Sequence, residues 1–205
     1  MATTKTNTFP QWIRWASVAW LAVWIPAYWI TWGASNFIHL CDIAVILTCA
    51  GIWLGNARLL SSQAVSSIAI DLLWDLDAAW KIFFGHTLLG ATDYLWDANF
   101  PHWVRMLSLF HVVWPILLLW SLKRAGYDRS GFIFQTSIAA LAMVAARYTN
   151  PAQNINYVFS DPILHRMWGP EPAHLALMWI GLVVVIYLPT HIVLRKISPP
   201  PEIAS

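Results

Sequence analysis

The feature that most constrains this chain is a series of six apolar stretches, each close to the length of a bilayer-spanning helix. A helix rises 1.5 Å per residue, so about 20 apolar residues cross the hydrocarbon core of a bilayer. These stretches predict an all-α fold, an integral membrane bundle of six transmembrane helices in one domain over 1–198, followed by a short Pro-rich tail at 199–205. The predicted spans lie near 12–32, 37–56, 63–84, 103–122, 131–148 and 173–194.

The composition agrees with a membrane location. Of the 205 residues, 59% are apolar and only 11% are charged, whereas a soluble domain carries roughly 25% charged residues. The formal net charge of +2 is too small to indicate a nucleic-acid partner. The chain also has no Gly-rich phosphate loop and no zinc or calcium motif, so no cofactor is predicted.

The two cysteines, Cys41 and Cys49, are predicted to be on one helix. Their separation corresponds to a rise of about 12 Å, and a disulfide needs Cα atoms within about 7 Å. We therefore expect no disulfide between them.

Lys and Arg residues predict the orientation, because cytoplasmic loops carry an excess of them. With the N-terminus in the cytoplasm, eight of the 12 fall on the cytoplasmic side and four on the other. Both termini are therefore predicted to be cytoplasmic. The eight are Lys5, Arg14, Arg58, Lys123, Arg124, Arg129, Arg195 and Lys196.

Polar residues within the predicted spans gather toward the outer side. In this topology Cys41 lies roughly 6 Å deep and His111 roughly 12 Å deep from the outer ends of their helices. Asp71 is predicted near the midplane, and Asp75 in the outer half. Because intramembrane polar residues are costly and often functional, we predict a polar cavity that opens to the outer half of the membrane, bounded by helices two to five.

Structural roles compete with functional ones for the residues around Cys41. His39 and Asp42 are three residues apart on one helix face and could hydrogen-bond each other or a neighbouring helix. Cys41 alone could be a small buried hydrophobic residue. His111 could simply satisfy a contact between helices.

The acidic residues of the third stretch need a partner or a proton. Asp71 and Asp75 are four residues apart and share a helix face. Two unpaired carboxylates there would be costly. We therefore expect at least one of them to be protonated, or paired with Arg105 or Arg147.

A metal site is a weaker interpretation. Four histidines could converge, but no two have the i,i+4 spacing that aligns two imidazoles on a helix. No metal site is therefore predicted. The four are His39, His102, His111 and His174.

Five short motifs in a fixed order resemble the YwaF family of bacterial six-helix membrane proteins, over about residues 36–191. They are HLC at 39–41, FPH at 100–102 with a histidine nine residues later, NINY at 154–157, GP at 169–170 and YLP at 187–189. The resemblance implies a bacterial plasma membrane location.

That family is related in fold to a eukaryotic transmembrane phospholipid acyltransferase with a Cys/His pair and to the androgen-induced Thr/His hydrolases of fatty-acid esters. The resemblance implies that Cys41 is a nucleophile, that His111 is its base and that Asn156 supports them. Asp42 departs from the small or apolar residue expected after the cysteine. The acids of the third stretch are a second departure.

Three functions follow as alternatives. The first is acyl transfer or ester hydrolysis on membrane lipids by Cys41 and His111, in which a thiolate–imidazolium pair attacks an ester carbonyl. The second is a small-solute or proton-coupled carrier that uses Asp71 and Asp75. The third is a non-catalytic subunit with a protein partner that the sequence does not identify. Supporting or substrate-binding residues are predicted to be His39, Asp42, Asp71, Asp75, His102, Arg105, Asn154, Asn156 and Tyr157.

Overall fold

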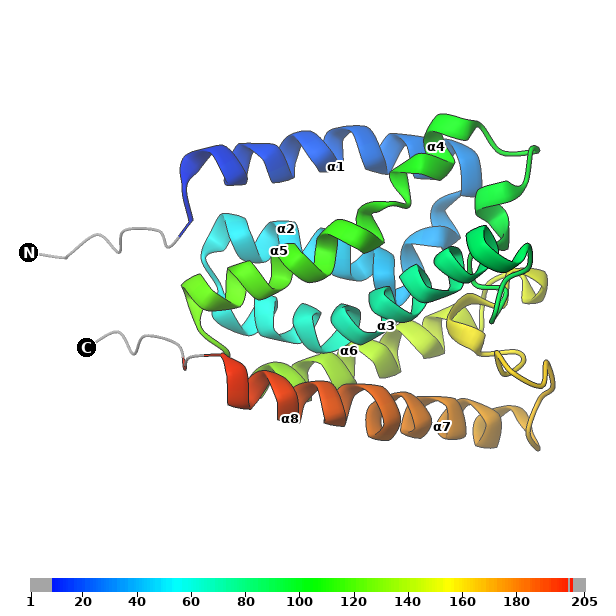
Figure 1. The fold of residues 1–205 in the computed structure, drawn as a ribbon. Coiled ribbons are helices and arrows are strands. Elements are labelled where there is room, and N and C mark those ends of the chain that lie inside the picture. The colour runs from blue at the N-terminus through cyan, green and yellow to red at the C-terminus, as the bar shows by residue number, and fades with distance from the viewer. Residues whose placement is uncertain (1–8, 199, 201–205) are drawn as a thin grey trace, which may run out of the picture.

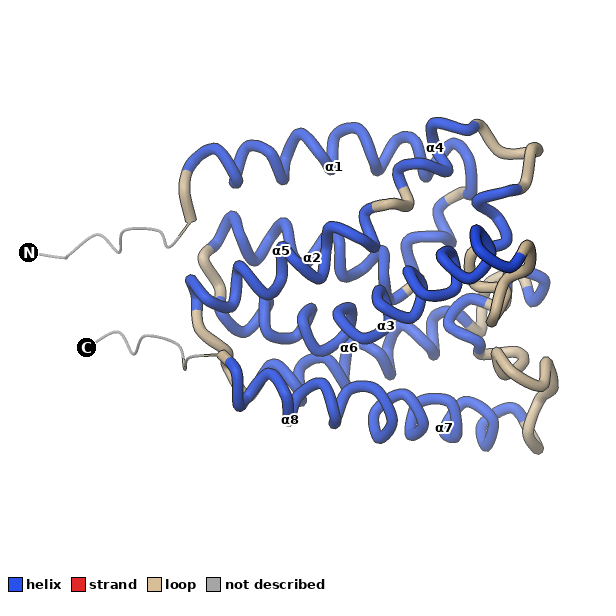
Figure 2. Tube along the Cα trace, in the orientation of Figure 1, coloured by secondary structure: helices blue, strands red, loops and turns tan. Residues whose placement is uncertain are grey.

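The computed structural model describes residues 9–198 and Pro200, and this part of the chain is helical without a β-strand. The predicted tail at 199–205, apart from Pro200, lies outside the described residues. Figures 1 and 2 show long helices running side by side and joined by loops at the two ends of the bundle. The prediction of an all-α fold is confirmed.

The helices occupy the predicted apolar stretches, and two of these stretches are divided. A break at Ser108 and Leu109 separates α4 from α5, and a π-helical segment, η5, joins α7 to α8. The elements are α1 (Gln11–Trp32), η1 (Ala34–Ile38), α2 (Leu40–Leu54), α3 (Ala57–Phe84), η2 (Asp93–Trp96), α4 (His102–Leu107), α5 (Phe110–Ala125), α6 (Ser130–Ala146), η3 (Pro151–Gln153), η4 (Ile155–Tyr157), α7 (Glu171–Gly181), η5 (Leu182–Tyr187) and α8 (Leu188–Ile197).

Helix α3 is the centre of the bundle, and α2, α5, α6 and the rod formed by η5 and α8 pack around it. Two glycines permit close packing there. A Cβ atom on Gly51 of α2 would lie 2.9 Å from the Leu60 side chain. A Cβ atom on Gly131 of α6 would lie 2.8 Å from the backbone nitrogen of Ser62. Small residues therefore let the α2 and α6 backbones approach α3 closely.

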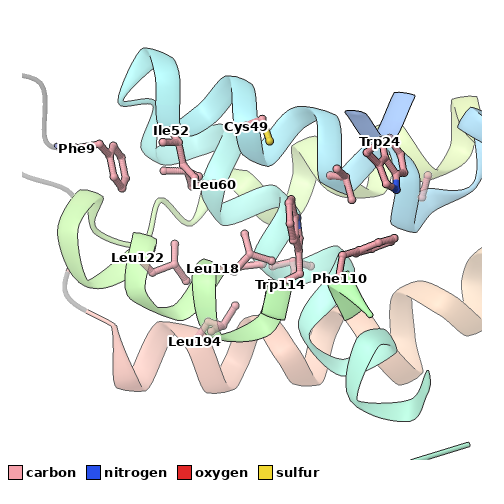
Figure 3. Packing of buried hydrophobic residues seen from close by; sticks show 14 of the residues in the cluster. Phe9, Trp24, Cys49, Ile52, Leu60, Phe110, Trp114, Leu118, Leu122 and Leu194 are labelled. Carbon is pink, nitrogen blue, oxygen red and sulfur yellow. The ribbon is translucent and has the colours of Figure 1, made fainter. Parts of the chain in front are cut away.

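The bundle has two different ends. At the terminal end, α1 begins and α8 finishes. The loop end carries the connections over 85–101 and 147–170 (Figure 1). A cluster of fully buried apolar side chains fills much of the interior toward the terminal end (Figure 3). It includes Ile52, Leu60, Leu118, Leu122 and Leu194.

Among the residues that the structure describes, two helical rods are long and apolar enough to cross a membrane, His102–Ala125 and Glu171–Ile197. Helices α2 and α6 are apolar but shorter. Helix α1 is rich in Trp, whose indole N–H makes it less hydrophobic than an aliphatic residue, and α3 carries several charged residues. Large apolar side chains nevertheless cover the outside of the bundle, among them Trp12, Ile30, Ile116, Leu141 and Val185. The structure is therefore compatible with membrane association.

Candidate functional site

A buried hydrogen bond joins the start of α5 to the middle of α3. Nδ1 of His111 lies 2.7 Å from Oδ1 of Asp71. His111 is 5% exposed and Asp71 is fully buried. An ionised carboxylate only accepts hydrogen bonds, so Nδ1–H of His111 donates to Asp71. In the neutral ring, the lone pair is then on Nε2, which can accept a proton.

Aromatic rings fix the orientation of His111. Its ring stacks on Trp74, with centroids 4.5 Å apart and planes 22° from parallel. It also stacks on Phe110, with centroids 4.1 Å apart. Trp74 follows Asp71 by three residues and therefore shares its face of α3. The ring is thus held by both its hydrogen bond and its packing.

The first turn of α2 carries the cysteine. Asp42 accepts a hydrogen bond from Nδ2 of Asn36, and its Oδ1 lies 3.8 Å from the Cys41 sulfur. The expected hydrogen bond between His39 and Asp42 is absent. His39 is the N-cap of α2, with φ −57° and ψ 135°, so the i,i+3 geometry of a helix does not apply to it.

Cys41 and Asp71 lie at similar heights in the bundle. Gly51 packs on Leu60, and α2 and α3 run in opposite directions from this contact. Cys41 is then about 15 Å and Asp71 about 16 Å from it toward the loop end. In this structure the Cys41 thiol bonds to Asp42, not to His111. The other cysteine, Cys49, is a buried free thiol.

Two carboxylate oxygens near His111 have no hydrogen-bond partner among the described residues. They are Oδ2 of Asp71 and Oδ1 of Asp75, both shielded from solvent. Asp75 lies within electrostatic range of Asp71 and His111. The site therefore has unused acceptor capacity beside the His111 ring.

The structure does not show the pairing of these acids with Arg105 or Arg147, which was one of the two expected alternatives. Nη1 of Arg105 donates to the Leu95 carbonyl. Arg147 donates to the Val158 carbonyl and forms an ion pair with Glu171. Both arginines lie at helix ends, where loop carbonyls lack partners within regular secondary structure. His111 is the partner of Asp71 instead.

Two tyrosines complete the polar region. The hydroxyls of Tyr28 on α1 and Ser108 are 2.7 Å apart. Tyr94 in η2 interacts electrostatically with Tyr28 and Cys41. Burial raises the pKa of Tyr94 well above its ordinary value, so its hydroxyl stays protonated and can donate a hydrogen bond at neutral pH.

Asn156 holds the start of α2 in place. Its Oδ1 accepts from the Leu40 backbone N–H, and its Nδ2 donates to the Ile38 carbonyl. It adopts φ 53°, a left-handed conformation that Asn tolerates better than most residues. Asn154 makes a different set of bonds, to Phe159 and Ser160 within its own loop. Asn156 therefore positions the segment that carries Cys41.

Tyr157 lies between this site and the loop end. Burial raises the pKa of its hydroxyl, and the charges of Cys41 and Asp77 raise it further. Its backbone carbonyl accepts a hydrogen bond from Nε2–H of His174, whose Nδ1 accepts from the Trp168 N–H. His174 is thus a buried structural histidine.

The structure does not bring the histidines together as metal ligands. His102 is exposed at the start of α4, and both ring nitrogens of His174 are hydrogen-bonded. No group of three or more His, Cys, Asp or Glu residues with metal-site geometry occurs in the described chain.

Sequence reasoning missed several residues of the site, namely Tyr28, Asn36, Trp74, Tyr94 and Ser108. Of these, only Trp74 had a readable signal, its i,i+3 spacing from Asp71. The others reach the site through loops or from other helices, so spacing along one helix could not reveal them.

No protein-family model, curated protein or solved structure matches this chain. The interpretation of the site therefore rests on its own geometry and chemistry.

Proposed function

We propose that this chain is an integral membrane enzyme that transfers or hydrolyses acyl groups of membrane lipid esters. The proposal includes six spans with both termini in the cytoplasm, which places the loop end at the outer face. It also includes the resemblance to the YwaF family and a bacterial plasma membrane location. The apolar exterior and the polar site near one end support the span arrangement. A reporter fused after residue 205 should be cytoplasmic.

The observation that carries the proposal is the buried hydrogen bond between His111 and Asp71. Two ionisable side chains are seldom the most stabilising way to fill an apolar interior, because desolvation opposes their burial. The pair does orient an imidazole so that Nε2 is basic, which is the arrangement of a general base. Intramembrane ionisable residues of this kind often mark functional sites.

Cys41 is the nucleophile in this proposal. The proposal requires the Cys41 side chain to rotate away from Asp42, so that its thiol reaches His111. Nε2 of His111 then takes the thiol proton, and the thiolate attacks the ester carbonyl. The carbon–oxygen ester bond breaks, an S-acyl cysteine forms, and the departing alcohol takes the proton from His111.

The second half of the reaction restores the thiol. Water or a lipid hydroxyl gives its proton to His111 and attacks the thioester carbonyl. The carbon–sulfur bond breaks, and the thiolate regains the proton. Water gives hydrolysis and a lipid hydroxyl gives transfer. In this proposal the neutral hydroxyls of Tyr28 and Tyr94 donate hydrogen bonds to the developing oxyanion.

A proton-coupled carrier is the second candidate, favoured by a polar stripe along α3. Gln135 on α6 donates to Ser66 and to the Tyr187 hydroxyl, and it accepts from Gln63. These buried groups lie beyond Asp71 toward the terminal end. Buried Leu60 lies one turn further along α3, within the large apolar cluster (Figure 3). That apolar layer opposes a continuous route and places this function second.

The test is an acyl-release assay with the purified chain in bilayer nanodiscs that contain phospholipid with a labelled acyl chain. We expect labelled fatty acid or a labelled acceptor lipid from the wild type. Cys41→Ala and His111→Asn should each lower the rate at least about 100-fold. Cys49→Ala is the matched control, because Cys49 is a buried thiol on the same helix. Wild-type rates in the Cys41 and His111 variants would contradict the proposal.

A further inference from the structure

A hollow lies at the loop end, and neither His111 nor Asp71 lines it. It is a pocket of about 460 Å³ between the loop that follows α3 and the loop that follows η4. Its lining is both polar and apolar, and includes Leu89, Gly90, Asp93, Tyr157, Ile163 and His165.

Two carboxylates, neither of which lines the pocket, hold its two loops in place by hydrogen bonds. Asp77 accepts hydrogen bonds from the backbone N–H groups of Leu89 and Thr92 and from the Thr92 hydroxyl. Asp161 accepts from the backbone N–H groups of Ile163, Leu164 and Arg166 and from the Trp168 indole. Each wall is therefore organised by a side chain that does not itself line the pocket.

Asp93 presents one unused carboxylate oxygen to the pocket. Its Oδ1 accepts from the Thr87 hydroxyl at 2.8 Å and lies 4.0 Å from Nζ of Lys81. Its Oδ2 has no hydrogen-bond partner in the described part of the chain. Gly90 lies beside this oxygen, since a Cβ atom on Gly90 would be in van der Waals contact with Oδ2 at 3.4 Å.

Tyr157 is the aromatic residue of the pocket lining. It adopts φ 58°, which is unfavourable for an aromatic residue. The conformation is held on both sides, by the hydrogen bonds of Asn156 to α2 and by the His174 bond to the Tyr157 carbonyl. Strain that the surroundings maintain is typical of functional positions.

We propose that this pocket binds the ammonium group of a zwitterionic lipid head group. A carboxylate supplies the opposite charge, and an aromatic ring supplies the cation–π surface that ammonium ligands prefer. Lys81 is the cation nearest to Asp93 and competes with the ligand for it. Asn156, next to Tyr157 in the chain, hydrogen-bonds to Ile38 and Leu40, so the pocket wall is connected to the start of α2, which carries Cys41. The pocket's role in selecting the substrate rests on the proposed function, the chemistry on lipid esters.

The experiment compares two short-chain lipids that differ only in head group, dihexanoyl phosphatidylcholine and dihexanoyl phosphatidylglycerol. Binding to the full chain in a neutral detergent is measured by calorimetry. We expect the choline lipid to bind at least about tenfold more tightly. Asp93→Asn should abolish this preference, while Asp97→Asn, in the same loop but outside the pocket lining, should retain it. Equal affinities in the wild type, or a preference retained in Asp93→Asn, would overturn the inference.

Two further comparisons sharpen the result. Tyr157→Phe retains the ring and should retain the preference, whereas Tyr157→Leu should reduce it about fivefold. A preference unaffected by Tyr157→Leu would overturn the aromatic contribution. Free choline should bind at least about tenfold more weakly than the choline lipid. Equal affinity for free choline would identify a soluble amine as the ligand and overturn the lipid assignment.

Binding and catalysis can fail separately. Cys41→Ala should retain the head-group preference while losing acyl release. Acyl release unchanged by Cys41→Ala, with the preference intact, would refute the proposed function but not the pocket. Cys41-dependent acyl release without any head-group preference would refute the pocket alone.

Discussion

Nδ1 of His111 lies 2.7 Å from Oδ1 of Asp71, in the buried contact between two antiparallel helices. The two residues are 40 positions apart in the chain, and only the packing of α5 on α3 brings them together. Through this contact the Asp71 carboxylate orients the His111 imidazole. The proposed chemistry depends on this hydrogen-bonded pair.

Activity should depend on the carboxylate group of Asp71 and not only on the space that its side chain fills. Asp71→Asn retains the shape, but its Nδ2 can donate to His111 and thereby favour the wrong tautomer. We expect the acyl-release rate to fall by about 100-fold or more. Asp75→Asn is the comparison, since Asp75 lies nearby without bonding to His111, and its rate should stay within about tenfold of wild type. Equal losses in the two variants would mean that the hydrogen bond has no special role.

Asn156 should stabilise the α2 start through both its side chain and its backbone conformation. Asn156→Gly permits φ 53° but loses two hydrogen bonds, and it should destabilise the protein by about 2 kcal/mol. Asn156→Ala should lose about 1 kcal/mol more, because alanine tolerates the left-handed region poorly. Denaturation in detergent compares the two, and hydrogen exchange at Leu40 localises the effect. An alanine variant more stable than the glycine variant would contradict this account.

Gly131 should be intolerant of even one methyl group. A Cβ atom there would lie 2.7 Å from the Ser61 Cβ and 2.8 Å from the Ser62 backbone nitrogen. Gly131→Ala should therefore lower stability by about 1–3 kcal/mol. Gly181→Ala is the control, because a Cβ atom there meets nothing within 4 Å. It should raise stability by about 0.5–1 kcal/mol through helix propensity alone. Thermal unfolding of both variants measures this, and similar values would show that α3 and α6 do not pack this closely.

The loop that Asp161 organises should open only in strong acid. The hydrogen bond from the Leu164 backbone N–H, with those from Ile163, Arg166 and the Trp168 indole, lowers the pKa of Asp161 to about 2. An unfolded Asp has a pKa of about 3.9. The stabilisation is thus complete above about pH 4 and is lost as the pH falls toward 2.

Hydrogen exchange at Ile163 and Leu164, corrected for intrinsic rates, should reveal that loss in the wild type. In Asp161→Asn the two sites should exchange faster at neutral pH and should not respond to acid through this group. Protection in the wild type that is unchanged from pH 5 to pH 2 would contradict the assignment.

The positions of the helices could be predicted because hydrophobic runs report them directly. The predicted stretch 12–32 corresponds to α1, and 131–148 corresponds to α6 within two residues at each end. The break between α4 and α5 could not be predicted, because Ser108 bonds to Tyr28 on another helix. Contacts between residues that are distant in the chain produce no periodic pattern in the sequence.

The site was predictable only in part, for a related reason. Asp71 and His111 stood out singly, as ionisable residues in apolar helices. Their pairing was missed because it depends on how far α5 is shifted along α3, which composition does not report. Arg105 and Arg147 seemed the natural partners by charge alone, but loop carbonyls already occupy them.

The most direct test of the central claim is mass spectrometry of the protein purified with its lipids, in search of a hydroxylamine-sensitive acyl group on Cys41. We expect the adduct in the wild type and in Cys49→Ala, and its loss in His111→Ala and Asp71→Asn. The adduct's mass would identify the acyl chain. A Cys41 that stays unmodified in the wild type and every variant, with phospholipids present, would contradict a covalent acyl-enzyme at this site.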